Sequence, residues 1–314
     1  MKNFIYKKEF FMKNFKSLLL LLMTAMIWGF AFVAQRMGAD YIEAFSFNGI
    51  RFLLGGISLI PVICIFEKRD AEIDLHKSKI KTTVFAGILA GIALFTASAL
   101  QQKGIEITGS AGKASFMTGL YTVLVPVFGV FLGKKTNLNV WLGAILAVLG
   151  MFFLCIVAED WTVSWKLSFG DVILFLNAVF WAIHILIIDR FVDRIYSLRF
   201  AFTQFIFCGG LSLVLGLLFE EISFALLQKA VIPILYCGVL SVGVAYTCQI
   251  IGQKTADPTY ASIILSTESM FGALGGAVVL KETMTKQGYL GCLLIFCGVI
   301  ISQLVFSKKT AKTL

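Results

Sequence analysis

The chain has 314 residues, of which 59% are hydrophobic and 14% charged, and its formal net charge is +9 at pH 7. A soluble domain has about 45–50% apolar and about 25% charged residues, so this composition excludes an ordinary soluble protein and predicts a membrane protein. The positive charge does not indicate nucleic-acid binding, because the Lys and Arg residues lie in short segments between apolar runs.

The first apolar run follows a basic segment that reads MKNFIYKKEFFMKNFKS. The string MKNF occurs at Met1 and again at Met12, so either methionine can be the start of translation. A basic segment before an apolar run is also typical of a signal peptide, but no small-residue cleavage site follows it. We therefore interpret this run as an uncleaved first membrane span.

Ten apolar windows are long enough to cross a bilayer, which takes about 20 residues in a helix. They predict an all-α integral membrane protein with spans at 17–35, 44–66, 82–102, 111–132, 139–157, 169–188, 198–219, 230–251, 259–280 and 287–306.

The basic residues predict the orientation of these spans. With the N-terminus inside, 19 of the 27 Lys and Arg residues lie in cytoplasmic segments and 7 lie outside. The positive-inside rule then favours two cytoplasmic termini. We expect a multi-pass protein of the cell (inner or plasma) membrane, and the high Lys, Phe and Ile content is typical of a bacterium.

The two halves of the chain repeat each other. ASFMTGLYTVLVPVFGVFLGKKT (114–136) aligns with ASIILSTESMFGALGGAVVLKET (261–283), and GILAGIALFTASALQQK (87–103) aligns with GVLSVGVAYTCQIIGQK (238–254). Trp28 aligns with Trp181. Each half, 17–157 and 169–306, then holds five spans. Because five is odd, the halves insert with opposite orientation, and inverted repeats of this kind build transporters with a central cavity.

Several motifs also resemble a known family. They are WGFAF near Trp28, RFLLGG opening with Arg51, and the two ASxx…G…LxxxT blocks. On these the chain resembles the EamA-type transporters of the drug/metabolite transporter superfamily over essentially its whole length. It departs from them at Ser269, where Glu-Pro is usual, at Lys281-Glu282 in place of Gly-Glu, and in the first block, with Tyr121 at the Glu position and Gly-Lys-Lys at 133–135. The resemblance implies ten helices around a central cavity, peripheral fifth and tenth spans, and export or exchange of small metabolites, often amino acids or drug-like compounds.

Glu268 is the tenth residue of its span and so lies near mid-depth. A charge there costs about 2.5–3.5 kcal/mol on insertion scales, so it normally faces a cavity or a partner. Three roles stay open: a protonated structural residue, a substrate-binding residue, or a carrier of a coupling proton. The repeat places Tyr121 opposite Glu268, which gives the cavity two different sides.

Other polar and aromatic side chains are predicted to line the same cavity. Asn177, Trp181 and His184 share one helix face, as do Tyr246, Gln249 and Gln253. For each, packing or hydrogen bonding between helices competes with a role in the cavity. The candidate cavity residues are Trp28, Gln102, Tyr121, Trp181, His184, Tyr246, Gln249 and Glu268.

The remaining unusual residues have structural interpretations. Gly272 and Gly276 form a GxxxG motif that lets helices pack closely. Arg51 is expected to extend towards the outer surface or to pack on an acidic neighbour, in preference to direct contact with a ligand. The seven Cys residues lie within or at the ends of apolar runs and predict neither disulfides nor a metal site.

Together these features predict a secondary transporter that exports small organic molecules by alternating access, with proton coupling as an open question. The chain has no Walker motif, so we expect no ATP hydrolysis and no cofactor. The expected partners are a small-molecule substrate and the lipid bilayer, and a homodimer stays open. The alternatives are a non-transporting membrane receptor or scaffold and an intramembrane enzyme, for which no HExxH or GxSxG motif is present.

Overall fold

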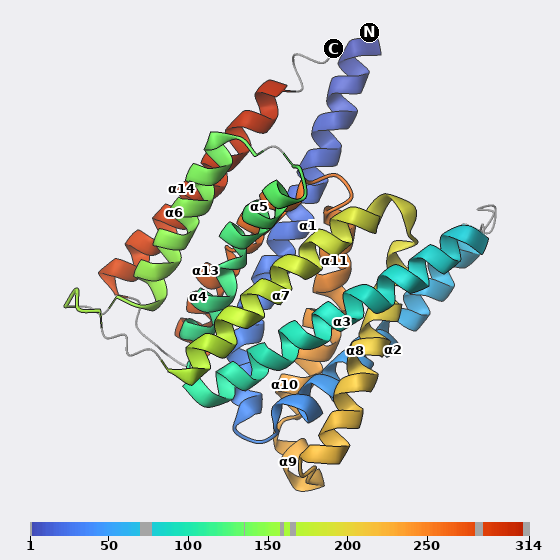
Figure 1. Cartoon of the computed structure of the whole chain (residues 1–314), viewed down its shortest axis with the longest axis vertical. Coiled ribbons are helices and arrows are strands. Elements are labelled where there is room, and N and C mark those ends of the chain that lie inside the picture. Colours follow the sequence, from blue (N-terminus) through green and yellow to red (C-terminus); the bar gives the residue numbers. More distant parts are fainter. Residues whose placement is uncertain are drawn as a thin grey trace.

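The computed structural model describes residues 2–69, 77–134, 136–157, 160–163, 168–279 and 285–309. Side chains are described for 15–65, 79–134, 136–157, 160–163, 168–279 and 285–302. These residues form a bundle of helices, and their only β pairing is an isolated bridge between Val157 and Val163 (Figure 1).

The helices form ten segments in chain order. The first five are α1 (Lys2–Ala39), α2 (Ala44–Arg69), α3 (Lys77–Thr108), α4 with α5 (Ala111–Gly119, Tyr121–Phe131) and α6 (Leu138–Cys155). The second five are α7 (Phe169–Phe191) with the short η1 (Val192–Arg194), α8 (Ser197–Phe219), α10 with η2 and α11 (Val231–Leu235, Tyr236–Tyr246, Thr247–Gly252), α12 with α13 (Pro258–Leu265, Glu268–Val279) and α14 (Lys286–Lys309). The short helix α9 (Phe224–Lys229) precedes α10.

Nine of these segments, within the described part of the chain, are long and apolar enough to cross a membrane. The tenth, α14, has an apolar stretch of Lys286–Ser302. The all-α membrane fold is thereby confirmed, nine of the ten predicted spans meet the length and hydropathy of a membrane span, and the tenth is a shorter apolar helix.

Contacts between the segments follow the repeat. α1 packs on α13 and on η2, and the equivalent helix of the second half, α7, packs on α4, α5 and α3. α2 packs on α8, and α6 packs on α14, so these two pairs each join equivalent helices. The α6–α14 pair lies at one edge of the bundle (Figure 1). This confirms the expectation that the fifth and tenth spans are peripheral.

Two segments predicted as continuous are broken near their middle. α4 ends at Gly119 and α5 begins at Tyr121, while α12 ends at Leu265 and α13 begins at Glu268. In the second break, the hydroxyls of Ser266 and Thr267 each bond the carbonyl three residues earlier, at 2.7 Å. Such local bonds compete with helical pairing, which explains a break without proline.

The eighth span has a second irregularity, because η2 is an 11-residue π-helix. π-helical turns are rare and are frequent at functional sites. Two side chains of α1 bond its carbonyls: Trp28 Nε1 donates to the Ser241 oxygen at 3.3 Å, and Thr24 Oγ1 to the Ala245 oxygen at 3.0 Å. The π-helix is therefore joined to the first half of the chain at the depth of Trp28.

Ser17 and Gly109 lie at opposite ends of the bundle, which are called the Ser17 end and the Gly109 end. At the Ser17 end, Ser17 Oγ donates to the Gly252 oxygen at 2.6 Å. The Gly109 end is the opposite one, where α3 turns into α4 through Gly109, which has a positive φ of 62°.

Candidate functional site

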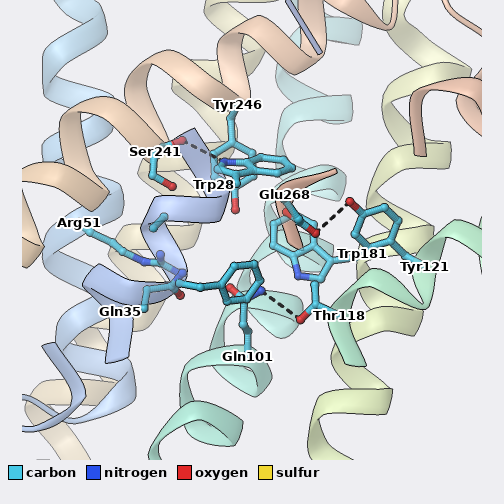
Figure 2. A pocket seen from close by; sticks show the side chains of 12 residues that line it. Trp28, Gln35, Arg51, Gln101, Thr118, Tyr121, Trp181, Ser241, Tyr246 and Glu268 are labelled. Atoms are coloured by element: carbon cyan, nitrogen blue, oxygen red, sulfur yellow. Dashed lines mark hydrogen bonds between the residues drawn. The ribbon is translucent and has the colours of Figure 1, made fainter. Parts of the chain in front are cut away.

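A small buried cavity lies between the two halves of the bundle, and helices of both halves form its wall (Figure 2). Its volume is ≈ 20 Å³, about the space of one water molecule. The first half contributes Trp28, Ala31, Phe32, Gln35, Arg51, Gln101, Thr118 and Tyr121, and the second half contributes Trp181, Ser241, Tyr246 and Glu268. The lining thus includes one basic and one acidic side chain.

A hydrogen bond between the halves crosses one side of this cavity. The Tyr121 hydroxyl donates to Glu268 Oε1 at 3.0 Å, and both side chains are buried. Tyr121 and Glu268 are the first residues of α5 and α13, directly after the two helix breaks. The positive end of the α13 dipole favours a carboxylate at this position.

Two further contacts flank this bond symmetrically. Ser115 Oγ donates to Ser269 Oγ at 2.9 Å, and Thr122 Oγ1 donates to the Ser262 oxygen at 3.3 Å. In the repeat alignment Ser115 corresponds to Ser262 and Thr122 to Ser269. The two contacts are therefore equivalents of each other, and the bond between Tyr121 and Glu268, which also correspond, lies on the pseudo-twofold axis.

Three aromatic rings form another side of the cavity. The Trp28 ring centroid is 4.7 Å from that of Tyr246 and 5.7 Å from that of Trp181, and Trp181 stacks on Tyr246 at 5.7 Å. Trp181 Nε1 is buried and has no hydrogen-bond partner among the described residues. The rings give the cavity a largely apolar face with one unused donor.

A polar group lies around Thr118. Its Oγ1 accepts from Asn177 Nδ2 at 2.7 Å and from Gln101 Nε2 at 3.4 Å. Asn177 belongs to α7 and Thr118 to α4, so this group also joins the two halves.

The structure brings five of the predicted cavity residues to the wall: Trp28, Tyr121, Trp181, Tyr246 and Glu268. The other three are buried behind it. His184 Nε2 is 3.0 Å from Gln204 Oε1, and its ring meets Trp181 edge-on at 5.6 Å. Gln102 Nε2 donates to the Gln35 oxygen at 3.2 Å, and Gln249 has no partner for either amide atom among the described residues.

The prediction for Arg51 was wrong. Arg51 is only 2% exposed and lines the cavity, and none of the ion pairs in the described part of the chain includes it. Its Nε donates to Asn48 Oδ1 at 2.8 Å. Asn48 stands three residues earlier on the same helix face, and this spacing was the signal that a partner inside the bundle was available.

Sequence reasoning also missed six other wall residues, Ala31, Phe32, Gln35, Gln101, Thr118 and Ser241. The repeat alignment favoured Gln102, because its Gln-Lys pair recurs in the second half, and gave no sign that Gln101 faces the cavity. Ser241 lies in the π-helix η2, and its backbone carbonyl accepts a hydrogen bond from Trp28 Nε1.

A larger cleft of ≈ 530 Å³ opens at the Gly109 end between α1, α4, α6 and α13. Phe32 lines both the cleft and the buried cavity, so the two spaces adjoin at this residue. Gly272 and Gly276, the predicted packing glycines, line this cleft. Gly272 also approaches Gly29 of α1, where a Cβ on Gly29 would lie 2.6 Å from the Gly272 nitrogen.

No group of three or more His, Cys, Asp or Glu that could hold a metal ion occurs among the described residues. The Lys281-Glu282 pair and Lys135 of the sequence motifs lie outside those residues.

Comparisons with known proteins agree with this arrangement. The model of the EamA-like transporter family matches residues 15–156 and again 168–304. The chain is 26% identical over 288 residues to an uncharacterized transporter of Archaeoglobus fulgidus, covering 90% of this chain and 84% of that one. It is 23% identical to the uncharacterized transporter YoaV of Bacillus subtilis, covering 94% and 99%.

A solved crystal structure that is 17% identical has the same fold, with a TM-score of 0.73, and the match covers 92% of this chain and 96% of that one. The fold and the cavity between its halves define a multi-pass membrane protein of the transporter class. The chain belongs to the EamA-like transporter family.

Proposed function

We propose that this protein is a secondary transporter that exports small organic metabolites, such as amino acids or drug-like compounds, by alternating access between its two halves. One observation carries the proposal: a buried cavity lies between the halves, and its wall includes an acid, Glu268, and a base, Arg51. Charged side chains at this depth usually mark a substrate or ion pathway.

The symmetry of the broken helices supports the alternating-access part. The Tyr121–Glu268 bond lies on the pseudo-twofold axis, and the equivalent Ser115–Ser269 and Thr122–Ser262 contacts lie on either side of it. A rocking motion about the axis would separate one flanking contact while keeping the other. Discontinuous helices at the meeting point of inverted repeats are typical of secondary transporters.

The proposed sidedness follows from the basic residues. With the Ser17 end cytoplasmic, 19 of 27 Lys and Arg residues lie inside, as the positive-inside rule requires. The cleft at the Gly109 end would then open to the outside of the cell membrane. We extend the proposal to a bacterial source on composition alone.

Uptake into proteoliposomes tests the proposal. Purified protein would be reconstituted and given a panel of labelled amino acids and cationic drugs, with and without a pH gradient, beside protein-free liposomes. Saturable uptake of one class of compound is the expected result. Folded, correctly reconstituted protein that moves no compound in a wide panel would contradict transport and favour the receptor or scaffold alternative.

Proton coupling is the finer part of the proposal, and Glu268 is its expected carrier. In the Glu268→Gln variant the amide keeps an oxygen that accepts from Tyr121, so the fold should survive. We expect this variant to lose gradient-driven accumulation and to keep exchange of substrate across the membrane when the substrate is saturating. Accumulation that stays dependent on the gradient in this variant would contradict the role.

A further inference from the structure

Arg51 is held rigidly in the cavity wall. Its Nε donates to Asn48 Oδ1 at 2.8 Å, and Asn48 Nδ2 donates in turn to the Ser98 oxygen at 2.9 Å. The guanidinium carbon lies 5.0 Å from the ring centroid of Phe52 and 5.6 Å from that of Phe47. These contacts fix the orientation of the guanidinium group but do not neutralise its charge.

The guanidinium retains an unused donor. Arg51 Nη2 is buried and has no hydrogen-bond partner among the described residues. Arginine stays protonated in proteins, so the group is a permanent cation. A buried charge without a counter-ion is costly, and a buried donor without an acceptor adds to that cost. An anion entering the cavity would remove both costs.

Glu268 is the acidic side chain in the same wall. It is 2% exposed, only its Oε1 is engaged by Tyr121, and no ion pair of the described residues includes it. In Figure 2, Arg51 enters from the left, and Glu268 lies with Tyr121 on the other side. The rings of Trp28 and Tyr246 lie above them. The cavity therefore has a cationic side and a carboxyl side with an aromatic surface beside them.

We propose that Arg51 binds the carboxylate and Glu268 the amino group of one substrate, so that the transported compounds are small zwitterions. This inference rests on the proposed function and narrows its substrate class. An arginine fork matches a carboxylate with two parallel hydrogen bonds. A substrate with a single charge leaves the other side of the cavity uncompensated, and this selects against simple cations and simple anions.

Binding requires the cavity to enlarge, because ≈ 20 Å³ admits about one water molecule. Phe32 lines both the cavity and the ≈ 530 Å³ cleft, so a movement at this residue is the shortest way to join the two spaces. A zwitterion entering from the cleft would then reach both charges.

The test compares three forms of the same compound. Quenching of tryptophan fluorescence in detergent reports binding, since Trp28 and Trp181 line the cavity. The probes are the L-amino acids, their methyl esters, which are cations, and their N-acetyl derivatives, which are anions. The wild type should bind at least one amino acid about tenfold or more tightly than its ester and its N-acetyl derivative.

Two variants assign the charges. Arg51→Gln should weaken binding of the amino acid about tenfold or more and bind the ester at least as tightly as the wild type does. Glu268→Gln should weaken binding of the amino acid to a similar extent and bind the N-acetyl derivative at least as tightly as the wild type does. Arg36→Gln, at the rim of the cleft, is the matched control and should bind all three forms like the wild type. Arg51→Lys serves if Arg51→Gln fails to fold; it should keep the preference for zwitterions with reduced affinity.

The proposal is overturned if the wild type binds the esters or the N-acetyl derivatives as tightly as the amino acids. Equal loss of all three forms in Arg51→Gln, or no binding of any amino acid by folded protein, overturns it as well. Uptake of singly charged compounds in the proteoliposome assay would keep the transporter proposal while this one fails. Selective binding of zwitterions without uptake would keep the zwitterion proposal while the transporter proposal fails.

Discussion

At the Gly109 end of the bundle a cleft of ≈ 530 Å³ opens between α1, α4, α6 and α13, whereas the equivalent region at the Ser17 end is filled. In the repeat, Gly272 and Phe32, which line the cleft, correspond to Val125 and Ile185. Val125 and Ile185 are buried in the main apolar core. The first pair differs in side-chain volume, because Gly272 has no side chain where Val125 fills space, whereas the large Phe32 ring still lines the open end.

The ion pairs at the two ends differ in how deeply they are buried. At the Gly109 end Lys113 Nζ lies 2.8 Å from Asp171 Oδ1, and the Asp171 side chain is fully buried. At the Ser17 end Lys134 pairs with Asp189, whose side chain is 21% exposed. Each pair joins α7 to the fourth span or to the residues just after it, and the pair at the open end is the more deeply buried of the two.

The largest expected effect follows from these two pairs. Asp171→Asn removes the charge that compensates Lys113 and also disturbs the cap of α7, where Ser168 and Asp171 bond each other's backbone nitrogens. Losing this charge-assisted hydrogen bond costs about 1.5–3 kcal/mol, and weakening the cap adds about 0.5–2 kcal/mol. Asp189→Asn, the matched control, should cost about 0.2–1 kcal/mol.

Thermal unfolding in one detergent measures both variants. A fall in the melting temperature several times larger for Asp171→Asn is expected, and equal shifts would show that burial does not distinguish the two ends.

A smaller loss is expected at the crossing of α1 and α13. A Cβ on Gly29 would lie 2.5 Å from the Glu268 oxygen and 2.6 Å from the Gly272 nitrogen, which are backbone atoms that cannot move alone. Gly29→Ala should therefore destabilise the protein by about 1–3 kcal/mol. Gly210→Ala is the control, because nothing lies within 4 Å of a Cβ there. Melting temperatures compare them; a Gly29→Ala variant as stable as Gly210→Ala would contradict the close crossing.

The third prediction concerns access and needs no change in stability. Gly112 lines the cleft and has open space around it, whereas Ser266 is fully buried beside the break in the ninth span. In intact cells, Gly112→Cys should react with a membrane-impermeant maleimide added outside, and Ser266→Cys should not. The unmodified chain, with its seven Cys residues, gives the background. Labelling of Gly112→Cys only after the cells are opened would reverse the proposed sidedness.

Much of the fold was predictable because a bilayer requires long apolar helices, and the ten apolar windows show their length directly. The two helix breaks were not predictable in the same way. Leu120 is as apolar as its neighbours and neither break contains proline; hydroxyl-to-carbonyl bonds at Ser266 and Thr267 interrupt the second segment. The π-helix in the eighth span has no distinct sequence pattern either.

The site was predictable where the repeat constrained it. Tyr121 and Glu268 correspond in the alignment, and an axis between inverted halves brings corresponding residues together, so their 3.0 Å bond follows from the repeat. Arg51 has Gln204 as its counterpart, so symmetry gave no sign of a charge in the cavity. Its place near the start of α2 suggested the surface, but Asn48 and the rings of Phe47 and Phe52 hold it inside.

A reversible cross-link between the fourth and ninth spans tests alternating access most directly. Ser115 Oγ and Ser269 Oγ are 2.9 Å apart, so cysteines at both positions should form a disulfide under mild oxidation. If the halves must separate at this contact, the oxidised double variant will show no uptake in proteoliposomes, and reduction will restore it. The single Ser115→Cys and Ser269→Cys variants should be unaffected by the oxidant. Uptake that continues at the wild-type rate through the cross-linked protein would contradict the account.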